Sequence, residues 1–584
     1  MKFFKLFYFI PLVFVSCSGD KKKEEIDLFI FNAKIYTADS SFSVKDAIAI
    51  DNGKIVFVGK KDELPENFLP LEMMDVQGKA IFPGFIDAHC HFLHYGLGLT
   101  QVDLVGTKSF NEVIERVVEF SRKNKEGWII GRGWDQNDWD VKEYPDRKKL
   151  DSLFPDRPVF LKRIDGHAAI ANKVALMNAG VNGETRMKGG KVEVRLLFHG
   201  EEWVSPALAK ELNHMGYTYP VPTGILIDNA VDLVDKTIPS ASQNELKDGL
   251  LAAQKNCFAV GLTTVDDAGL MKSEIDFIDS LQKTGELKMR IYAMLSDSAP
   301  NYEHYLKAGP YKTDYLNVRS FKFYADGALG SRGACLKEDY SDKKGWKGFL
   351  LNSIDHFENN YGIVQKNKFQ VNTHCIGDSS VKNTLIILTY GEIGMENADI
   401  DYSHKSVEQR IMRRNRIEHF QVFDSMDINY FNQGVIPSVQ PTHATSDMYW
   451  AKERLGEKRM KYAYAYKTLL KNAGVIALGT DFPVEDISPF KTFYAAVFRK
   501  DSKGFPEGGF QIEEALTREE TIRGMTIWAA YSNFEEKEKG SLEKGKFADF
   551  IILDTDLMTA DEKDILKTKV LYTFINGEKV YEKK

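Results

Sequence analysis

Two histidines one residue apart end an apolar run and form the first candidate metal site in the chain. The run, residues 82–92, reads FPGFIDAHCHF. Because side chains on a strand alternate between its two faces, His89 and His91 point to one side and Cys90 points to the other. Two imidazoles on one face at a strand end can chelate a borderline metal ion such as zinc. Taken alone, the motif fits a pair of hydrogen-bonded polar histidines equally well.

Further metal-ligand side chains recur at the ends of later apolar runs. Lys322 lies within SFKFYADG, His374 ends FQVNTH, His419 ends RIEH, and Asp481 follows VIALGT. If these runs are parallel strands of one barrel, their ends lie at the same mouth, where barrel active sites are found. A lone strand-end histidine is more often a core residue. Four histidines and an acid in the order HxH, His, His, Asp indicate one shared site.

The middle of the chain must supply the elements that position these side chains. It alternates short apolar runs, from residues 128–130 and 159–161 to residues 475–478, with helical patterns such as residues 272–283. This alternation predicts an α/β fold with a parallel sheet, and eight or so repeats favour a closed (β/α)8 barrel of the TIM type. An open doubly wound sheet is the alternative, but no Gly-rich dinucleotide fingerprint follows the early strands. Residues 109–235 exceed one βα unit, and we interpret part of them as an insertion over the barrel mouth.

Both ends of the chain are rich in short strands. Residues 47–50 and 55–58 flank the turn DNGK and predict a hairpin, and a similar turn, NGE, follows residues 570–575. We therefore predict a small composite β-sandwich domain built from both termini, with the barrel inserted between its halves. The predicted boundaries are 26–80 and 536–584 for the β domain and 81–535 for the barrel. The capping-box spacing from Thr517 to Glu520 predicts the start of the last barrel helix.

The first residues read as a targeting segment. Lys2 and Lys5 flank the start of an apolar run, residues 6–15, that is too short to span a bilayer as a helix. The run ends in FVSC, which resembles a bacterial lipoprotein cleavage site. Residues 1–17 are then a signal peptide with Cys17 as the lipidation site, and residues 18–25 are a solvated tether. The expectation is an exported lipoprotein, membrane-anchored at a bacterial cell envelope; an ordinary secretory signal cleaved nearby is the alternative.

Composition excludes some classes of function. Hydrophobic residues make up 43% and charged residues 28% of the 584 residues, as in ordinary globular proteins. The net charge of -7 gives no electrostatic case for binding nucleic acid. The five cysteines are scattered and form no disulfide framework. Cys90 and Cys375 each neighbour a candidate ligand histidine and read as small core residues.

The candidate ligands stand within motifs that resemble the amidohydrolase superfamily. These motifs are PGFIDAHCH at 83–91, His374 followed by IGD at 376–378, Glu418-His419, and GTDFPV at 479–484. Other stretches resemble amidohydrolase family 3, which includes the N-substituted formamide deformylases. They are GRGW at 131–134, DGHA at 165–168, DGALGSR at 326–332, QPTH at 440–443 and GSLE at 540–543. The likeness covers nearly everything from residue 26 to the C-terminus, with Thr480 where serine is common.

The resemblance implies a barrel with a centre of one or two divalent ions, usually zinc. The implied metal ligands are His89, His91, Lys322, His374, His419 and Asp481. His89 and His91 would bind the more buried ion, and His374 and His419 the second. Lys322 matches a lysine that is carboxylated in many members of the superfamily and bridges the two ions. The alternatives are an ammonium paired with Asp326 or Asp481, and a mononuclear site.

The implied activity is the metal-dependent hydrolysis of a non-peptide C–N bond in a small-molecule amide or N-formyl compound. A metal-activated hydroxide would attack the carbonyl carbon, and Asp481 would take its proton and pass it to the leaving nitrogen. His167 is the candidate donor that polarises the carbonyl; a packing role at a helix start fits it equally well. Trp134 and His443 are candidate substrate contacts, with plain packing as the alternative for each.

Other functions stay open on the same residues. An aminoacylase, a cyclic-amide hydrolase or a deaminase could use the same scaffold, since one fold hosts many chemistries. A catalytically retired, lipid-anchored binding protein belongs to a different class of function. The complete ligand set argues against it, because a retired site need not keep every ligand. Whether the chain forms a homodimer is left open by the sequence.

Overall fold

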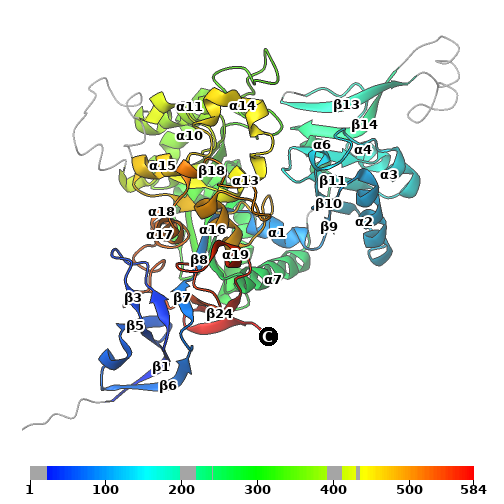
Figure 1. The fold of residues 1–584 in the computed structure, drawn as a ribbon. Helices are drawn as coiled ribbons and strands as arrows, with labels where there is room; N and C mark the ends of the chain where they lie inside the picture. Colours follow the sequence, from blue (N-terminus) through cyan, green and yellow to red (C-terminus); the bar gives the residue numbers. More distant parts are fainter. Residues whose placement is uncertain (1–22, 188, 198–218, 240, 391–410, 429–433) are drawn as a thin grey trace, which may run out of the picture.

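The computed structural model describes residues 23–187, 189–197, 219–239, 241–390, 411–428 and 434–584. The predicted signal peptide and Cys17 lie outside the described residues. Figure 1 shows three parts, a barrel, a β domain below it that carries both ends of the described chain, and a lobe beside the barrel. None of the helices in the described ranges combines the length and the apolar character that crossing a bilayer requires.

Eight parallel strands form the barrel and confirm the predicted fold class. In sheet order they are β8 (Phe85–Cys90), β15 (Leu262–Leu270), β16 (Arg290–Ser296), β18 (Leu316–Tyr324), β19 (Gln370–Cys375), β20 (Arg416–His419), β21 (Ile436–Val439) and β22 (Ala477–Leu478). Two backbone hydrogen bonds join the chain after β22 to β8. The Asp481 N–H donates to the His89 carbonyl at 2.7 Å, and the His91 N–H donates to the Phe482 carbonyl at 2.8 Å. The last strand thereby returns to the first.

Helices follow most barrel strands and cover the outside of the barrel (Figure 1). They include α1 (Phe92–Gly98), α7 (Gln243–Ala259), α8 (Lys272–Lys283), α10 (Ile354–Lys366), α11 (Asp378–Tyr390), α13 (Pro441–Asp447), α15 (Tyr466–Ala473), α16 (Pro489–Phe498) and α17 (Arg518–Gly524). The predicted capping box begins α17. The Thr517 side chain accepts from the Glu520 N–H at 3.1 Å, and the Glu520 carboxylate accepts from the Thr517 N–H at 2.8 Å.

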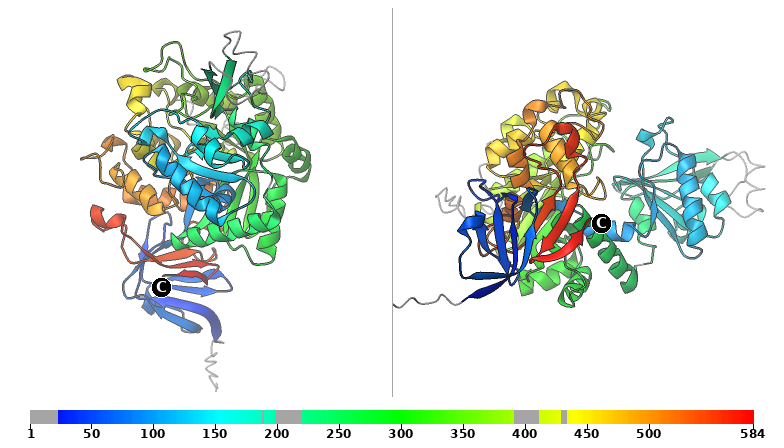
Figure 2. Two further views of the ribbon diagram at one scale, coloured as in Figure 1. Left: turned by 90° about the vertical axis from the view of Figure 1, so that its right-hand side faces the viewer. Right: turned by 60° about the horizontal axis from the view of Figure 1, so that its bottom comes forward.

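The β domain is built from both termini, as predicted. One sheet has the order β5-β4-β1-β6, with β1 (Glu24–Phe31), β4 (Ala47–Asp51), β5 (Lys54–Gly59) and β6 (Phe68–Asp75). The other has the order β25-β24-β23-β7-β2-β3, with β2 (Lys34–Tyr36), β3 (Val44–Lys45), β7 (Ala80–Pro83), β23 (Phe550–Leu553), β24 (Val570–Ile575) and β25 (Glu578–Glu582). Pairing of β7 with β23 joins the two ends of the chain, and Figure 2 shows their strands side by side. Strand β1 begins at Glu24, inside the segment predicted to be a tether.

The lobe beside the barrel has its own six-stranded sheet, of order β13-β14-β12-β11-β10-β9. Its strands are β9 (Val102–Asp103), β10 (Ile129–Trp134), β11 (Val159–Arg163), β12 (Ala168–Ala171), β13 (Gly190–Leu197) and β14 (Tyr219–Asp228). The apolar runs 128–130 and 159–161, predicted to belong to the barrel alternation, contribute to this sheet instead. Strands β10 and β11 are parallel, with helix α3 (Lys148–Leu153) between them. The local pattern is therefore that of a βα unit, and only tertiary pairing shows which sheet it joins.

Candidate metal centre

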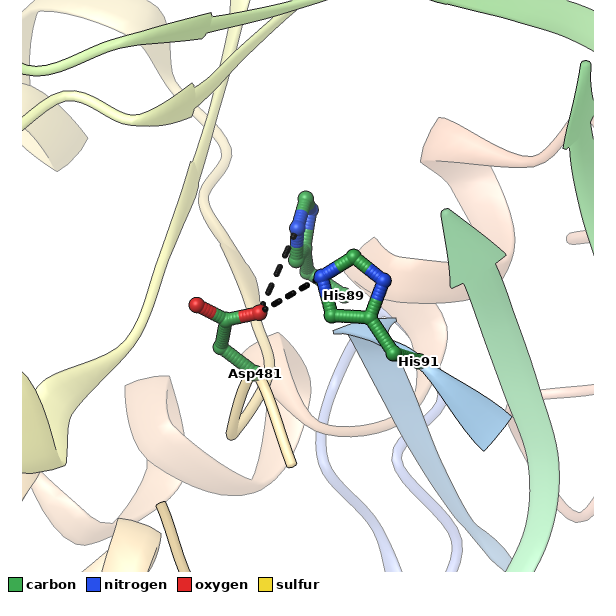
Figure 3. Close-up of side chains that lie close together, drawn as sticks. All are labelled: His89, His91 and Asp481. Carbon is green, nitrogen blue, oxygen red and sulfur yellow. Dashed lines mark ion pairs between the residues drawn. The ribbon is translucent and has the colours of Figure 1, made fainter. Parts of the chain in front are cut away.

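His89 and His91 lie on one side of the end of β8. Their rings meet edge to face with centroids 5.8 Å apart, and Cys90 is fully buried on the other side of the strand, as alternation predicts. Both rings face the Asp481 carboxylate (Figure 3). His89 Nε2 lies 3.6 Å and His91 Nε2 lies 3.3 Å from Asp481 Oδ1. These three side chains have metal-ligand atoms within 4.8 Å of one another.

The other predicted ligands converge on the same centre from the ends of β18, β19 and β20. Lys322 Nζ lies 3.2 Å from His89 Nε2. The ring of His419 lies 4.8 Å from the ring of His89 and 4.5 Å from the ring of His374, measured between centroids. Residues spread over almost 400 positions of the sequence therefore share one centre at the barrel mouth.

A second ligand group differs from the predicted pairing. His419 and Asp481 form it with His443, which was predicted to be a substrate contact, and their ligand atoms also lie within 4.8 Å of one another. His443 Nε2 is 3.8 Å from Asp481 Oδ2. His374 stays beside His419 but belongs to neither group among the described residues. Its Nε2 lies 3.9 Å from Asp326 Oδ1.

Hydrogen bonds to the far ring nitrogens orient three of the histidines. His89 Nδ1 lies 2.6 Å from Glu418 Oε2, His91 Nδ1 lies 3.0 Å from the Ala268 carbonyl, and His419 Nδ1 lies 2.8 Å from Gln440 Oε1. Each partner is an acceptor, so each Nδ1 carries the hydrogen and each Nε2 keeps its lone pair. A metal-binding histidine requires this arrangement, because its second nitrogen holds the ring in place.

A buried chain of charges lies behind His89. Arg416 is fully buried, and its Nε lies 2.8 Å from Glu418 Oε1 while its Nη1 lies 2.8 Å from Asp266 Oδ2. Although burial alone would raise it, the charges of Arg416 and His89 hold the pKa of Glu418 down at about 2. Glu418 therefore stays an anion throughout the physiological range and fixes the tautomer of His89.

The centre is electrostatically suited to a metal ion. Burial and the nearby charge of Lys322 lower the pKa of His89 to about 4, and burial lowers the pKa of His374 and His419 well below the ordinary value. These rings are therefore neutral at pH 7, as metal ligation requires. Burial alone would raise the pKa of Asp481, but the close approach of His91 and the other imidazoles around the carboxylate hold that pKa well below its ordinary range.

Buried polar atoms without hydrogen-bond partners test the fit of the site to a metal. His374 Nε2 and Asp481 Oδ1 have no partner among the described residues, and the two residues are at most 8% exposed. Buried polar groups are paired in nearly all proteins, and an unpaired one marks a missing partner. Nitrogen and carboxylate atoms converging at this spacing suit zinc or a similar divalent ion. The residues present therefore fit the group that the resemblance implies.

The lobe brings His167 close to this centre. A cavity of about 210 Å³ lies between the lobe and the barrel, lined by Lys162, His167 and Asp228 on one side and Gly327, Phe349 and Leu351 on the other. Burial alone would lower the pKa of His167, but its 3.1 Å hydrogen bond to Asp228 and the charge of Asp165 raise it. The charge of His167 also contributes to the low pKa of His374. The insertion thus brings the His167 imidazole, with a raised pKa, to the mouth.

Trp134 does not take the substrate-contact role predicted for it. Its side chain is fully buried in the core of the lobe, beside Trp139, and its Nε1–H donates to the Leu161 carbonyl at 2.8 Å. Arg132, two residues earlier, is the member of the same motif that approaches the centre. Its Nη2 donates to the Ile164 carbonyl at 2.8 Å; burial lowers the pKa of its guanidinium, and the charge of Asp481 acts in the opposite direction.

Comparison with known proteins agrees with this geometry. The sequence model of the amidohydrolase family matches residues 72–581. The chain belongs to this family. It is 32% identical to the protein LONG AFTER FAR-RED 3 of Arabidopsis thaliana, over 95% of this chain and 91% of that protein. It is 25% identical to the N-substituted formamide deformylase of Arthrobacter pascens, over 95% of this chain and 98% of that enzyme.

A solved structure shares the architecture of this amidohydrolase. It is the crystal structure of an uncharacterized metal-dependent hydrolase from Pyrococcus horikoshii, with a TM-score of 0.71 and 26% sequence identity. The match covers 92% of this chain and 99% of that one. The family and these neighbours show a metal-dependent hydrolase scaffold with a site for a small molecule.

Several residues that shape the centre were not assigned a role from the sequence. Glu418 belongs to a recognised motif, but strand alternation would turn it away from His419. His419 has a positive φ of 72°, so it does not follow the alternation of side chains along the strand. Glu418 and His419 can therefore both point toward the metal centre. Gln440 belongs to the QPTH motif but was given no role, and Gln421 carries no sequence signal beyond its place after β20. Their roles follow only from the rings they contact.

Proposed function

We propose that this amidohydrolase hydrolyses a non-peptide C–N bond, that of an amide or N-formyl group. The observation that carries the proposal is the pair of Nε2 lone pairs of His89 and His91 turned toward one ionised carboxylate, Asp481, at a barrel mouth, with His419 beside the same carboxylate. The likeness to an N-substituted formamide deformylase over nearly the whole chain supports the N-formyl class. An aminoacylase, a cyclic-amide hydrolase or a deaminase is the second candidate on the same residues.

A bound metal, which we expect to be one or two zinc ions, would supply a water molecule of lowered pKa and would polarise a carbonyl oxygen. His89, His91, His419 and Asp481 would hold it, with His374 beside them. Asp481 remains a carboxylate with Oδ1 unpaired, so it can accept the proton of the attacking water and transfer it to the leaving nitrogen. His167, whose pKa is raised by its hydrogen bond to Asp228, is the proposed donor of a hydrogen bond to the substrate from the lobe.

We propose that Lys322 is carboxylated and that its carbamate would help to hold a pair of ions. Its side chain is fully buried, and burial lowers the pKa of the amine to about 8, which makes the neutral form that reacts with carbon dioxide accessible. Intact-mass measurement of the metal-loaded protein, with Lys322→Ala as the reference, tests the carbamate. An unmodified mass in a protein that holds two ions would contradict it.

The experiment for the reaction class combines metal analysis with a substrate panel. The purified protein is loaded with zinc, and hydrolysis of N-formyl amines, N-acyl amino acids, cyclic amides and aminopurines is followed by amine or ammonia release. Preferential turnover of N-formyl or N-acyl amines supports the proposal. Bound metal without turnover across the panel would favour the retired binding protein instead.

Export and lipid anchoring are proposed on the sequence alone. Cys17 follows a short apolar segment with flanking lysines, as in a bacterial lipoprotein. Fractionation of cells that express the full chain, with Cys17→Ala as the control, tests this. Membrane association that is lost in Cys17→Ala supports the anchor, and equal distribution of the two proteins would argue against it.

A further inference from the structure

The imidazole of His443 differs from the other histidines of the centre in the partner of its Nδ1. His443 lies in the first turn of α13, directly after β21, and is 7% exposed. Its Nδ1 lies 3.2 Å from Gln421 Nε2. An amide nitrogen donates and never accepts, so this Nδ1 must be the acceptor. The ring hydrogen of His443 therefore sits on Nε2.

This tautomer is the reverse of the one in the ligand histidines. His89, His91 and His419 direct Nδ1 at an acceptor and keep an Nε2 lone pair for a metal. His443 keeps an Nε2–H, which cannot bind a metal ion. The grouping of His443 with His419 and Asp481 by distance therefore reflects a shared centre and not a shared role.

The Nε2–H of His443 has no partner of its own. No described residue accepts from it, and Asp481 Oδ2, at 3.8 Å, is too far for a hydrogen bond. A buried donor without an acceptor costs on the order of 1–3 kcal/mol. Among the described residues, the Gln421 oxygen and the Thr442 hydroxyl are buried without partners as well.

We infer that His443 is a catalytic donor that binds the carbonyl oxygen of the substrate, and that Gln421 is the positioning residue that holds its tautomer. The inference deepens the proposed function and rests on it. A donor aimed at an oxygen that gains negative charge during the attack stabilises the transition state more than the bound substrate. The substrate class is therefore one with a carbonyl oxygen at the scissile bond, which N-formyl and N-acyl amines have and aminopurines lack.

Paired variants separate a donor from a ligand. His443→Leu should keep its zinc content and lose about 10²–10³-fold in kcat, the cost of one donor at such a site. His443→Gln, which retains an amide N–H, should recover part of that loss. Gln421→Leu should lower kcat by about 10–100-fold with zinc affinity unchanged. Gln440→Leu, the same change beside a ligand histidine, should instead weaken zinc binding by about 10–100-fold.

Two controls keep the test decisive. Gln365→Leu, on α10 outside the site, should leave kcat and zinc affinity unchanged, and melting curves establish that each variant folds. Loss of zinc in His443→Leu or Gln421→Leu, or unchanged kcat in both, would overturn the inference. If the wild type turns over no substrate, the proposed function fails by itself. In that case the 15N NMR spectrum of the zinc-loaded protein shows which ring nitrogen of His443 carries the hydrogen. The inference requires that Nδ1 carries none, and a hydrogen on Nδ1 would overturn it.

Discussion

Replacing Glu418 with glutamine removes the buried charge behind the metal centre while keeping its shape. The carboxylate is fully buried between His89 Nδ1, at 2.6 Å, and Arg416 Nε, at 2.8 Å. The variant leaves Arg416 with Asp266 as its remaining carboxylate partner. It also removes the anion that holds the hydrogen of His89 on Nδ1.

The size of the effect follows from the pKa of Glu418. Its environment lowers that pKa from 4.5 to about 2. One pKa unit corresponds to about 1.4 kcal/mol, so the ionised form is favoured by roughly 3 kcal/mol in the folded protein. Breaking a buried pair by removing one partner costs about 3–5 kcal/mol, which agrees. Because the pKa is depressed, this stabilisation is complete above pH 4.5 and disappears as the pH falls toward 2.

Urea unfolding of the metal-free proteins measures this difference. Glu418→Gln should lose about 3 kcal/mol at pH 7 and show a weaker loss of stability than the wild type between pH 4.5 and 2. Zinc affinity should fall by about 10–100-fold, because His89 loses its orienting partner. Glu536→Gln is the matched control, since its pair with Arg414 is partly exposed and worth about 1 kcal/mol at most. Unfolding and zinc binding like those of the wild type would refute the reasoning.

Three further changes probe the site, the lobe and the β domain. Asp481→Asn should retain measurable zinc but lose most turnover, and a kcat near that of the wild type would exclude it as the proton acceptor. Trp134→Phe, which removes the bond to the Leu161 carbonyl, should cost about 1 kcal/mol in stability and leave KM unchanged, as measured by urea unfolding and steady-state kinetics. Asp549→Ala should lower the free energy of unfolding by about 3–5 kcal/mol, because the fully buried Arg290 loses the carboxylate to which it is bonded at 2.6 and 2.9 Å. An unchanged urea midpoint would show that this pair does not join the β domain to the barrel.

Much of the architecture could be predicted because periodic patterns report local structure. The hairpin of β4 and β5 and the start of α17 follow from turn and capping residues, and the strand-rich ends of the chain placed the barrel between two halves of a β domain. The assignment of β10 and β11 could not be predicted. An apolar run indicates that a strand is buried, but it does not indicate to which sheet that strand belongs.

The ligand set was visible in the sequence because strand ends of one barrel converge. The partners of those ligands were not. Gln421 and Gln440 are equivalent as residue types, yet one presents its amide nitrogen to His443 and the other its oxygen to His419. That difference depends on side-chain orientation, which has no counterpart in spacing or periodicity. It is nevertheless the difference by which we distinguish the proposed metal ligand His419 from the proposed donor His443.

The closure of the barrel and the assembly of the metal centre are the same structural event. The Asp481 N–H bonds to the His89 carbonyl at 2.7 Å, and Thr480 bonds to Asp87 through its backbone and its hydroxyl. These contacts hold Asp481 at φ 63°, a conformation that costs a non-glycine residue about 1–3 kcal/mol. The strain is therefore balanced by bonds between the last strand and the first. The carboxylate is aimed at His89 and His91 by the fold itself, so the ligands require little rearrangement to receive a metal ion.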